Sequence, residues 1–167
     1  AAPAAAAGGA GGALHASAEL KNTGGEVVGW ARFTEDANGI RHVNVHVRGL
    51  SEGLHGIHIH RVAGCTLGTT PAFSSAGTHH ALAGQSHGLD DPPGAHAGDL
   101  PNLVVNGAGI GHLNATSDRA TLSAGPVSVF DANGSALVIH ADEDDQESTS
   151  STGNSGIRIA CGIIVAN

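Results

Sequence analysis

The stretch "HVNVHVR" at residues 42–48 alternates valine with polar residues along its whole length. Side chains of a β-strand point alternately to opposite faces, so Val43, Val45 and Val47 would share one face and the polar residues the other. This pattern predicts a half-buried strand. Seven further segments also have the composition of strands: 14–21, 26–35, 55–61, 99–106, 112–117, 135–141 and 157–166.

Turn sequences separate most of these strands. They are "NTGG", two copies of "DANG", and "NGAG". Glycine and asparagine provide the backbone angles that tight turns between strands require. Eight short strands joined in this way predict an all-β fold, an antiparallel sandwich or barrel.

Two connections and the start of the chain do not fit the strand pattern. Residues 62–98 and 142–156 are long, rich in Gly, Ser and Asp, and without periodicity. Long loops on a compact β scaffold are usually either functional or disordered. Residues 1–13, "AAPAAAAGGAGGA", are of low complexity and predict a disordered leader or tether, which leaves residues 14–167 as the domain.

The composition disfavours two classes of partner. Seven Lys and Arg stand against 15 Asp and Glu, a formal charge of -8, and such a surface would repel the phosphates of nucleic acids. No stretch reaches the roughly 20 apolar residues of a membrane span. We therefore expect neither a nucleic-acid partner nor a membrane-spanning segment.

The chain contains two cysteines, Cys65 and Cys161. A disulfide between them would close a loop of about 100 residues, which stabilises a fold by roughly 4–5 kcal/mol in the chain-entropy model. Such a bond would indicate an oxidising compartment outside the cytosol. We expect the disulfide; the alternative is two buried free thiols.

Histidine is unusually abundant, with 12 residues, and three of them lie in "GLHGIHIH" at residues 53–60. In a strand, His58 and His60 would point to the same face, about 7 Å apart, so that both imidazoles can reach one metal ion. Ile57 and Ile59 would then face the core. A His-x-His pair alone is a weak signal, and it needs further ligands elsewhere in the chain.

Further ligands follow in the first long loop, where His79, His87, His96 and Asp99 lie close in sequence. Three imidazoles and one carboxylate suit a tetrahedral zinc site, although a solvated histidine-rich loop would have the same composition. His140 ends the strand segment "ALVIH". Several imidazoles without a thiolate suit copper or zinc.

From about residue 14 to the end, the chain resembles the copper/zinc superoxide dismutase family, and its bacterial secreted or periplasmic members in particular. The motifs that carry the resemblance are "GLHGIHIH", "AGTHH", "SHG", "AHAGDLPNL", "LVIHADEDD" and "TGNSGIRIACG". The resemblance implies an eight-stranded antiparallel Greek-key β-sandwich or barrel with two long functional loops. It also implies an enzyme that converts superoxide to oxygen and hydrogen peroxide.

The resemblance also implies a set of metal ligands. Copper, cycling between Cu(II) and Cu(I), would be held by His58, His60, His79 and His140. Zn(II) would be held by His79, His87, His96 and Asp99. His79 would thus bridge the two ions and take part in catalysis, with the adjacent His80 as a competitor for that position.

Other roles are implied in the second long loop. Asp144 would join the copper ligand His58 to the zinc ligand His87, with Asp142 and Asp145 as close rivals. Arg158 would hold the superoxide anion in catalysis, and Thr152 would narrow the channel. The loop itself, "ADEDDQESTSSTGNSG", has five acidic residues and no cation, so we expect weak electrostatic steering of the anion through it.

For localisation, the resemblance to secreted bacterial members implies an extracytoplasmic enzyme: periplasmic, envelope-tethered or secreted. It allows a homodimer or a monomer. The rival hypothesis is a non-catalytic copper/zinc-binding domain. A copper carrier is disfavoured because methionine is absent, and a zinc hydrolase because four protein ligands would leave zinc no open position.

Overall fold

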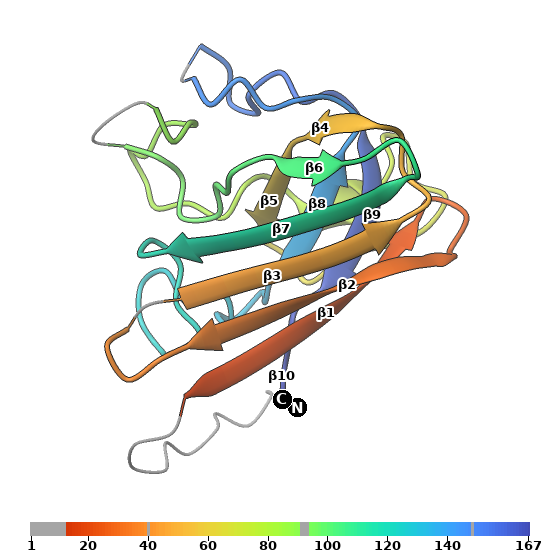
Figure 1. Ribbon diagram of the computed structural model, residues 1–167. Coiled ribbons are helices and arrows are strands. Elements are labelled where there is room, and N and C mark those ends of the chain that lie inside the picture. Colours follow the sequence, from red (N-terminus) through yellow and green to blue (C-terminus); the bar gives the residue numbers. More distant parts are fainter. Residues whose placement is uncertain (1–12, 40, 91–93, 148) are drawn as a thin grey trace.

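The computed structural model describes residues 13–39, 41–90, 94–147 and 149–167, and Figure 1 shows its fold. The predicted leader, residues 1–13, lies outside the described residues except for Ala13. The only helical element of the described part is one short 3-10 turn, Ser74–Ala76. The strands are β1 (Leu14–Asn22), β2 (Val27–Glu35), β3 (Arg41–Arg48), β4 (Gly53–His55), β5 (Ile57–His60), β6 (Leu103–Val105), β7 (Ile110–Ser117), β8 (Ala136–His140), β9 (Arg158–Ile163) and β10 (Val165–Ala166).

The strands form one antiparallel sheet in the order β4-β6-β7-β3-β2-β1-β9-β8-β5, with the short β10 paired to β1. The two outermost strands, β4 and β5, follow each other in the sequence, and the sheet curls back on itself into a nearly closed barrel (Figure 1). The predicted all-β antiparallel fold class is confirmed.

The predicted number of strands, eight, is too low because two predicted strands are interrupted. The first, 55–61, overlaps two short strands that meet at Gly56. Residues 53–55 pair with β6 and residues 57–60 with β8, while the N–H of Gly56 donates to the carbonyl of Asp142 at 2.8 Å. A Cβ at Gly56 would lie 2.5 Å from the Cβ of Ser155, so only glycine fits at this change of partner.

The second interrupted strand is segment 157–166, and one further predicted strand, 99–106, is shortened. Segment 157–166 is interrupted at Ile164, whose N–H donates to Ser135 at 3.0 Å instead of continuing the ladder. Segment 99–106 pairs as a strand only from Leu103 onward. Pro101 precedes this point and has no N–H to donate to a sheet.

The interior of the barrel follows the alternation in β3. Val43, Val45 and Val47 are buried, and the residues between them are exposed, as predicted. Ile57 and Ile59 of β5 are also buried in the core, but so are His58 and His60 on its other face. The second face of β5 must therefore be covered by the long loops.

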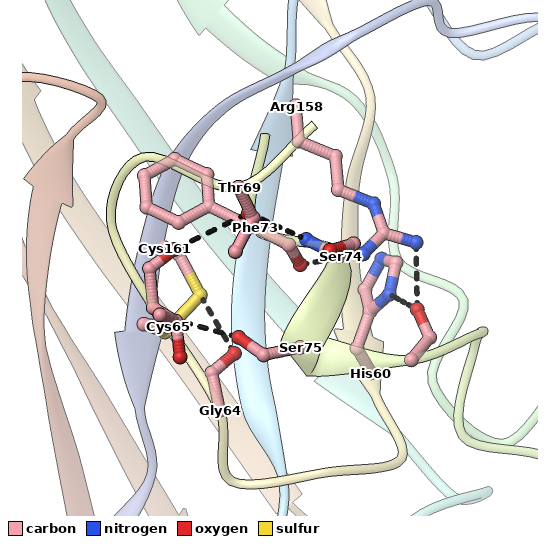
Figure 2. Close-up of a disulfide and its surroundings, with 11 residues drawn as sticks. His60, Gly64, Cys65, Thr69, Phe73, Ser74, Ser75, Arg158 and Cys161 are labelled. Carbon is pink, nitrogen blue, oxygen red and sulfur yellow. Dashed lines mark hydrogen bonds between the residues drawn. A yellow bond between two sulfur atoms is a disulfide. The ribbon is translucent and has the colours of Figure 1, made fainter. Parts of the chain in front are cut away.

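The predicted disulfide is present between Cys65 and Cys161, whose Cα atoms are 5.6 Å apart. It ties the first long loop to β9, and Figure 2 shows the loop backbone folded around it. No helix in the described residues is long and apolar enough to cross a membrane.

Candidate metal centre

Four histidines converge beside β5. His58 and His60 come from β5 and His140 from the end of its neighbour β8, while His79 lies in the first long loop. One ring nitrogen of each lies within 4.8 Å of the others, and all four residues are buried. We call this set the four-histidine cluster.

Backbone pairing along the free edge of β5 holds two residues of the first long loop, His79 and Asp99, beside the strand. His79 forms an isolated antiparallel bridge with His60, and Asp99 forms another with His58. The N–H of His80 donates to the carbonyl of Ile59 at 2.8 Å, and the N–H of Ile59 donates to Gly98 at 2.9 Å. The loop thus completes the edge of the sheet and presents His79 and Asp99 beside the strand histidines.

Each histidine of the cluster that belongs to a strand has one ring nitrogen anchored outside the cluster. His60 Nδ1 contacts the Gly77 carbonyl at 2.9 Å, and His140 Nδ1 contacts the Gly156 carbonyl at 3.1 Å. His58 Nε2 lies 2.5 Å from Asp144 Oδ2. These contacts orient the rings so that the opposite nitrogen of each points into the cluster.

Those opposite nitrogens are buried and have no hydrogen-bond partner. They are His58 Nδ1, His60 Nε2, His79 Nε2 and His140 Nε2. Unpaired buried polar atoms are rare in proteins, and each calls for an explanation such as a bound ion. Four of them directed at one point fit a transition metal with nitrogen ligands, for which copper is suited.

Burial keeps these imidazoles neutral. It lowers the pKa of His58 to about 3 and that of His140 to about 4, and it lowers the pKa of His60 well below its usual value. Neutral imidazole is the form that binds metals, so the cluster is ready to accept an ion at neutral pH.

A second set of ligands surrounds Asp99, which is buried. Its Oδ1 lies 3.1 Å from His87 Nδ1, 3.2 Å from His79 Nδ1 and 3.5 Å from His96 Nδ1. With zinc bonds of about 2.0–2.1 Å, the ligand atoms of a tetrahedral site would be about 3.3 Å apart. The donor set therefore fits zinc, and we call it the Asp99 cluster.

One compact grouping around Asp99 differs in one member from the predicted zinc set. His58, His79, His87 and Asp99 offer ligand atoms that all lie within 4.8 Å of one another. His96 is only half-buried, and its Nδ1 lies 3.2 Å from His79 Nδ1. His58 enters this grouping because its ring stacks on that of His79, with centroids 4.0 Å apart.

His79 lies between the two clusters. Its Nε2 is the unpaired atom in the four-histidine cluster, and its Nδ1 faces Asp99. The competing residue, His80, turns away from both clusters, with its Nε2 3.1 Å from the carbonyl of Val127. The structure thus places His79, and not His80, where one imidazole can contact two ions.

Asp144 joins the two clusters through its two carboxylate oxygens. Oδ2 contacts His58 Nε2 at 2.5 Å, and Oδ1 contacts His87 Nε2 at 2.9 Å. Its sequence rivals Asp142 and Asp145 are exposed. The structure therefore selects Asp144 among the three acidic residues as the one that touches a histidine of each cluster.

The carboxylates and His87 have shifted pKa values. Burial alone would raise the pKa of Asp144 and of Asp99, but their hydrogen bonds with histidines hold both pKa values well below the usual range. Burial alone would lower the pKa of His87, but hydrogen bonds to Asp144 and Asp99 raise it to about 9. His87 therefore carries a proton at neutral pH when no metal is bound.

Two residues that support Asp144 were missed in the sequence. The side chain of Asn102 accepts from the N–H of Asp144 and donates to its carbonyl, both at 2.8 Å. Gly153 has a φ of 63°, and a Cβ there would lie 1.9 Å from Asp144 Oδ1. Asn102 lies within the motif "AHAGDLPNL" and Gly153 within "TGNSGIRIACG". Membership in these motifs was the one feature of the sequence that pointed to either residue.

Arg158 and Thr152 line a cavity of about 600 Å³ that opens onto His60, His79 and His140. The Arg158 guanidinium donates to the carbonyls of Phe73 and Gly77, at 2.8 and 2.6 Å. Figure 2 shows the Arg158 guanidinium beside His60, where it contacts the loop that the disulfide holds. Among the described residues, the cavity lining contains Arg61 and Arg158 and no carboxylate.

His55 is another buried histidine that is not assigned to a metal, and both of its ring nitrogens contact backbone carbonyls. Its Nδ1 contacts the His140 carbonyl at 2.7 Å, and its Nε2 contacts the Ser51 carbonyl at 2.9 Å. Four further histidines, His15, His42, His46 and His112, are in strands of the sheet and outside both clusters.

Comparison with known proteins identifies relatives along most of the chain. Residues 27–164 match the family model of copper/zinc superoxide dismutase. A protein of Aquifex aeolicus named superoxide dismutase [Cu-Zn] 2 is 40% identical over 153 residues, which cover 90% of this chain and 86% of that protein. A protein of the same name from Mesembryanthemum crystallinum is 36% identical over 148 residues, 86% of this chain and 90% of that protein.

Solved structures agree with these matches. A SOD-like protein from Bacillus subtilis superposes with a TM-score of 0.80 at 32% identity, covering 89% of this chain and 97% of that one. Its double mutant, in which a tyrosine and a proline are replaced by histidine, gives a TM-score of 0.79 at 35% identity over 88% and 95% of the two chains. The chain described here belongs to the copper/zinc superoxide dismutase family.

Proposed function

We propose that this protein is a copper/zinc superoxide dismutase, which converts superoxide to oxygen and hydrogen peroxide. The observation that carries the proposal is the set of four unpaired, buried imidazole nitrogens directed at one point, since three of these histidines, His60, His79 and His140, line the same cavity as Arg158. Relatives that carry the name superoxide dismutase support it over most of the chain.

We assign copper to His58, His60, His79 and His140. Copper held there supplies one-electron redox chemistry, by which two superoxide ions and two protons become oxygen and hydrogen peroxide. A second assignment places zinc at Asp99 with the Nδ1 atoms of three histidines, His79, His87 and His96. Zinc has a single oxidation state in proteins, so its role there is structural and electrostatic.

The protein's own residues bind the anion and handle a proton. The Arg158 guanidinium, fixed by the Phe73 and Gly77 carbonyls, provides charge and N–H donors for superoxide at the cavity wall. Thr152 narrows the same cavity. His79 can hold a proton at Nε2, the atom that has no other partner.

The test is superoxide dismutation by the purified protein, free of metal and after loading with copper and zinc. Activity that appears with copper and disappears on its removal supports the proposal. A fully loaded protein without activity would instead favour the non-catalytic metal-binding domain.

We further propose an extracytoplasmic location, because the structure contains a disulfide, and disulfides persist mainly in oxidising compartments. Fractionation of the native cells with a thiol-trapping assay tests this. An oxidised protein outside the cytosol is expected, and a cytosolic pool with two free thiols would contradict it.

A further inference from the structure

A row of side chains on the outer face of the sheet is not used by the proposed function. Trp30 of β2 pairs with His46 of β3, His46 pairs with His112 of β7, and His112 pairs with Val104 of β6. All four residues are exposed, with exposed fractions of 53% for Trp30 and 58% for Val104. Two imidazoles therefore stand next to each other at the centre of the row, between two exposed apolar residues.

The two imidazoles are in direct contact. Their ring centroids are 3.9 Å apart, slightly closer than the 4.0 Å between His58 and His79 in the buried centre. Within the described residues, neither ring has a hydrogen bond or an ion pair, so both have free nitrogens. The other two outer-face histidines are engaged: His15 with Thr34 at 3.3 Å, and His42 with Asp36 at 3.6 Å.

We infer that His46 and His112 form a surface binding site for one divalent copper ion. Imidazole is a preferred ligand of copper, which binds such sites more strongly than the other divalent first-row metals do. Directly opposite residues of an antiparallel pair have Cβ atoms about 4.5–5.5 Å apart, close enough for both rings to reach one ion. The paired strands already hold both ligands in register, and the net charge of -8 favours cations.

The site has two protein ligands and is open to solvent, so water completes its coordination. Its affinity is therefore lower than that of the four-histidine cluster, and it fills after the buried centre. Because it lies on the outer face of β3 and β7, its occupation does not depend on whether the buried centre dismutates superoxide.

The single tryptophan of the chain reports on this site. Trp30 is directly paired with His46, and paramagnetic Cu²⁺ at short range quenches indole fluorescence. The protein is first loaded with copper and zinc, loosely bound metal is removed with a chelator so that only the buried centre stays filled, and Cu²⁺ is then added while Trp30 emission is followed. We expect quenching that saturates at one further equivalent per chain, and a large excess of Zn²⁺ should restore the emission by competing for the same nitrogens.

Substitutions distinguish the pair from a lone histidine. His112→Ala leaves His46 beside Trp30 but removes the second ligand, and it should abolish the saturable phase, as should His46→Ala. His15→Ala is the matched control, because it removes an exposed histidine from the same face, in a different row, and it should leave the titration unchanged. The dismutase activity of all three variants should equal that of the parent, which shows that they fold.

Two results would overturn the inference. Quenching that persists with the same midpoint in His112→Ala would mean that copper binds to His46 alone. Quenching without saturation in the parent would mean that the outer face has no defined copper site.

Discussion

The four-histidine cluster and the Asp99 cluster differ in the elements that carry their ligands and in the charges of those ligands. The four-histidine cluster takes three of its members from the paired strands β5 and β8, and burial keeps these imidazoles neutral. The Asp99 cluster takes its members from a loop, and its charges balance each other: Asp99 is ionised, and hydrogen bonds raise the pKa of His87 to about 9. A strand framework can hold uncharged ligands ready for an ion, whereas the loop ligands are held partly by an ion pair that a metal must replace.

The comparison therefore predicts different consequences when each cluster is damaged. His60→Ala removes a ligand held by β5 and should reduce superoxide dismutation to the level of the metal-free protein, the largest effect expected. His96→Ala removes the least buried ligand of the Asp99 cluster and should leave measurable activity while lowering zinc content and melting temperature. Stopped-flow superoxide decay and metal analysis of both variants check this, and equal activities would refute the division of roles.

Substitution of Asp144, which contacts a histidine of each cluster, is expected to have the next largest effect. Asp144→Asn keeps the shape but removes the charge that contacts His58 and His87. Loss of such an outer partner typically weakens metal binding by about 10–100-fold. Affinity for both metals should fall, because Asp144 contacts His58 Nε2 in one cluster and His87 Nε2 in the other.

Competition with a chelator of known affinity measures both constants for this variant. The exposed Asp145→Asn variant is the matched control, since its carboxylate contacts Asn154 and not a cluster histidine. Unchanged zinc affinity in Asp144→Asn would show that the carboxylate has no role in the Asp99 cluster.

The protonation difference predicts different pH dependences of metal binding. Zinc must displace the His87 proton, whose pKa is about 9, so apparent zinc affinity should rise about tenfold per pH unit up to about pH 9. In the zinc-free protein, copper binds His58 and His140, whose pKa values are about 3 and 4, so copper affinity should vary little above pH 5. Calorimetric titrations in buffers of different ionisation enthalpy count the protons released, and equal release by both metals would contradict this.

The smallest expected effect concerns attraction of the substrate. The second long loop supplies acidic residues, and the cations that line the cavity are Arg61 and Arg158. The dismutation rate should fall only gently as ionic strength rises, and Arg61→Ala should slow the rate slightly and flatten that dependence further. A steep decline that survives in Arg61→Ala would contradict weak steering and place the positive field elsewhere.

The sequence predicted the strand-borne parts of the molecule better than the loop-borne parts. The alternation in "HVNVHVR" corresponds to β3, and His58 and His60 fall on one face of β5 because strand periodicity fixes side-chain direction. No periodicity governs residues 62–98, so composition alone suggested a zinc site in this loop, and only the resemblance divided its histidines between two metals. The bridges of His79 and Asp99 to the free edge of β5 link residues distant in sequence, and no local pattern encodes them.

The same limit explains the supporting residues that sequence reasoning missed. Asn102 and Gly153 act on Asp144 from two different loops, and each looks like an ordinary turn residue in its own segment. The disulfide was predicted because the chain has only two cysteines. The interruption at Gly56 was not, because the change of strand partner depends on Asp142 and Ser155, far along the chain.

The most direct test of the two-cluster account is anomalous X-ray diffraction from crystals loaded with copper and zinc, with data collected at the absorption edge of each metal. The account predicts copper among His58, His60, His79 and His140, and zinc beside Asp99, with His79 between the two ions. Both metals mixed at one position, or an ion coordinated by His80, would contradict it.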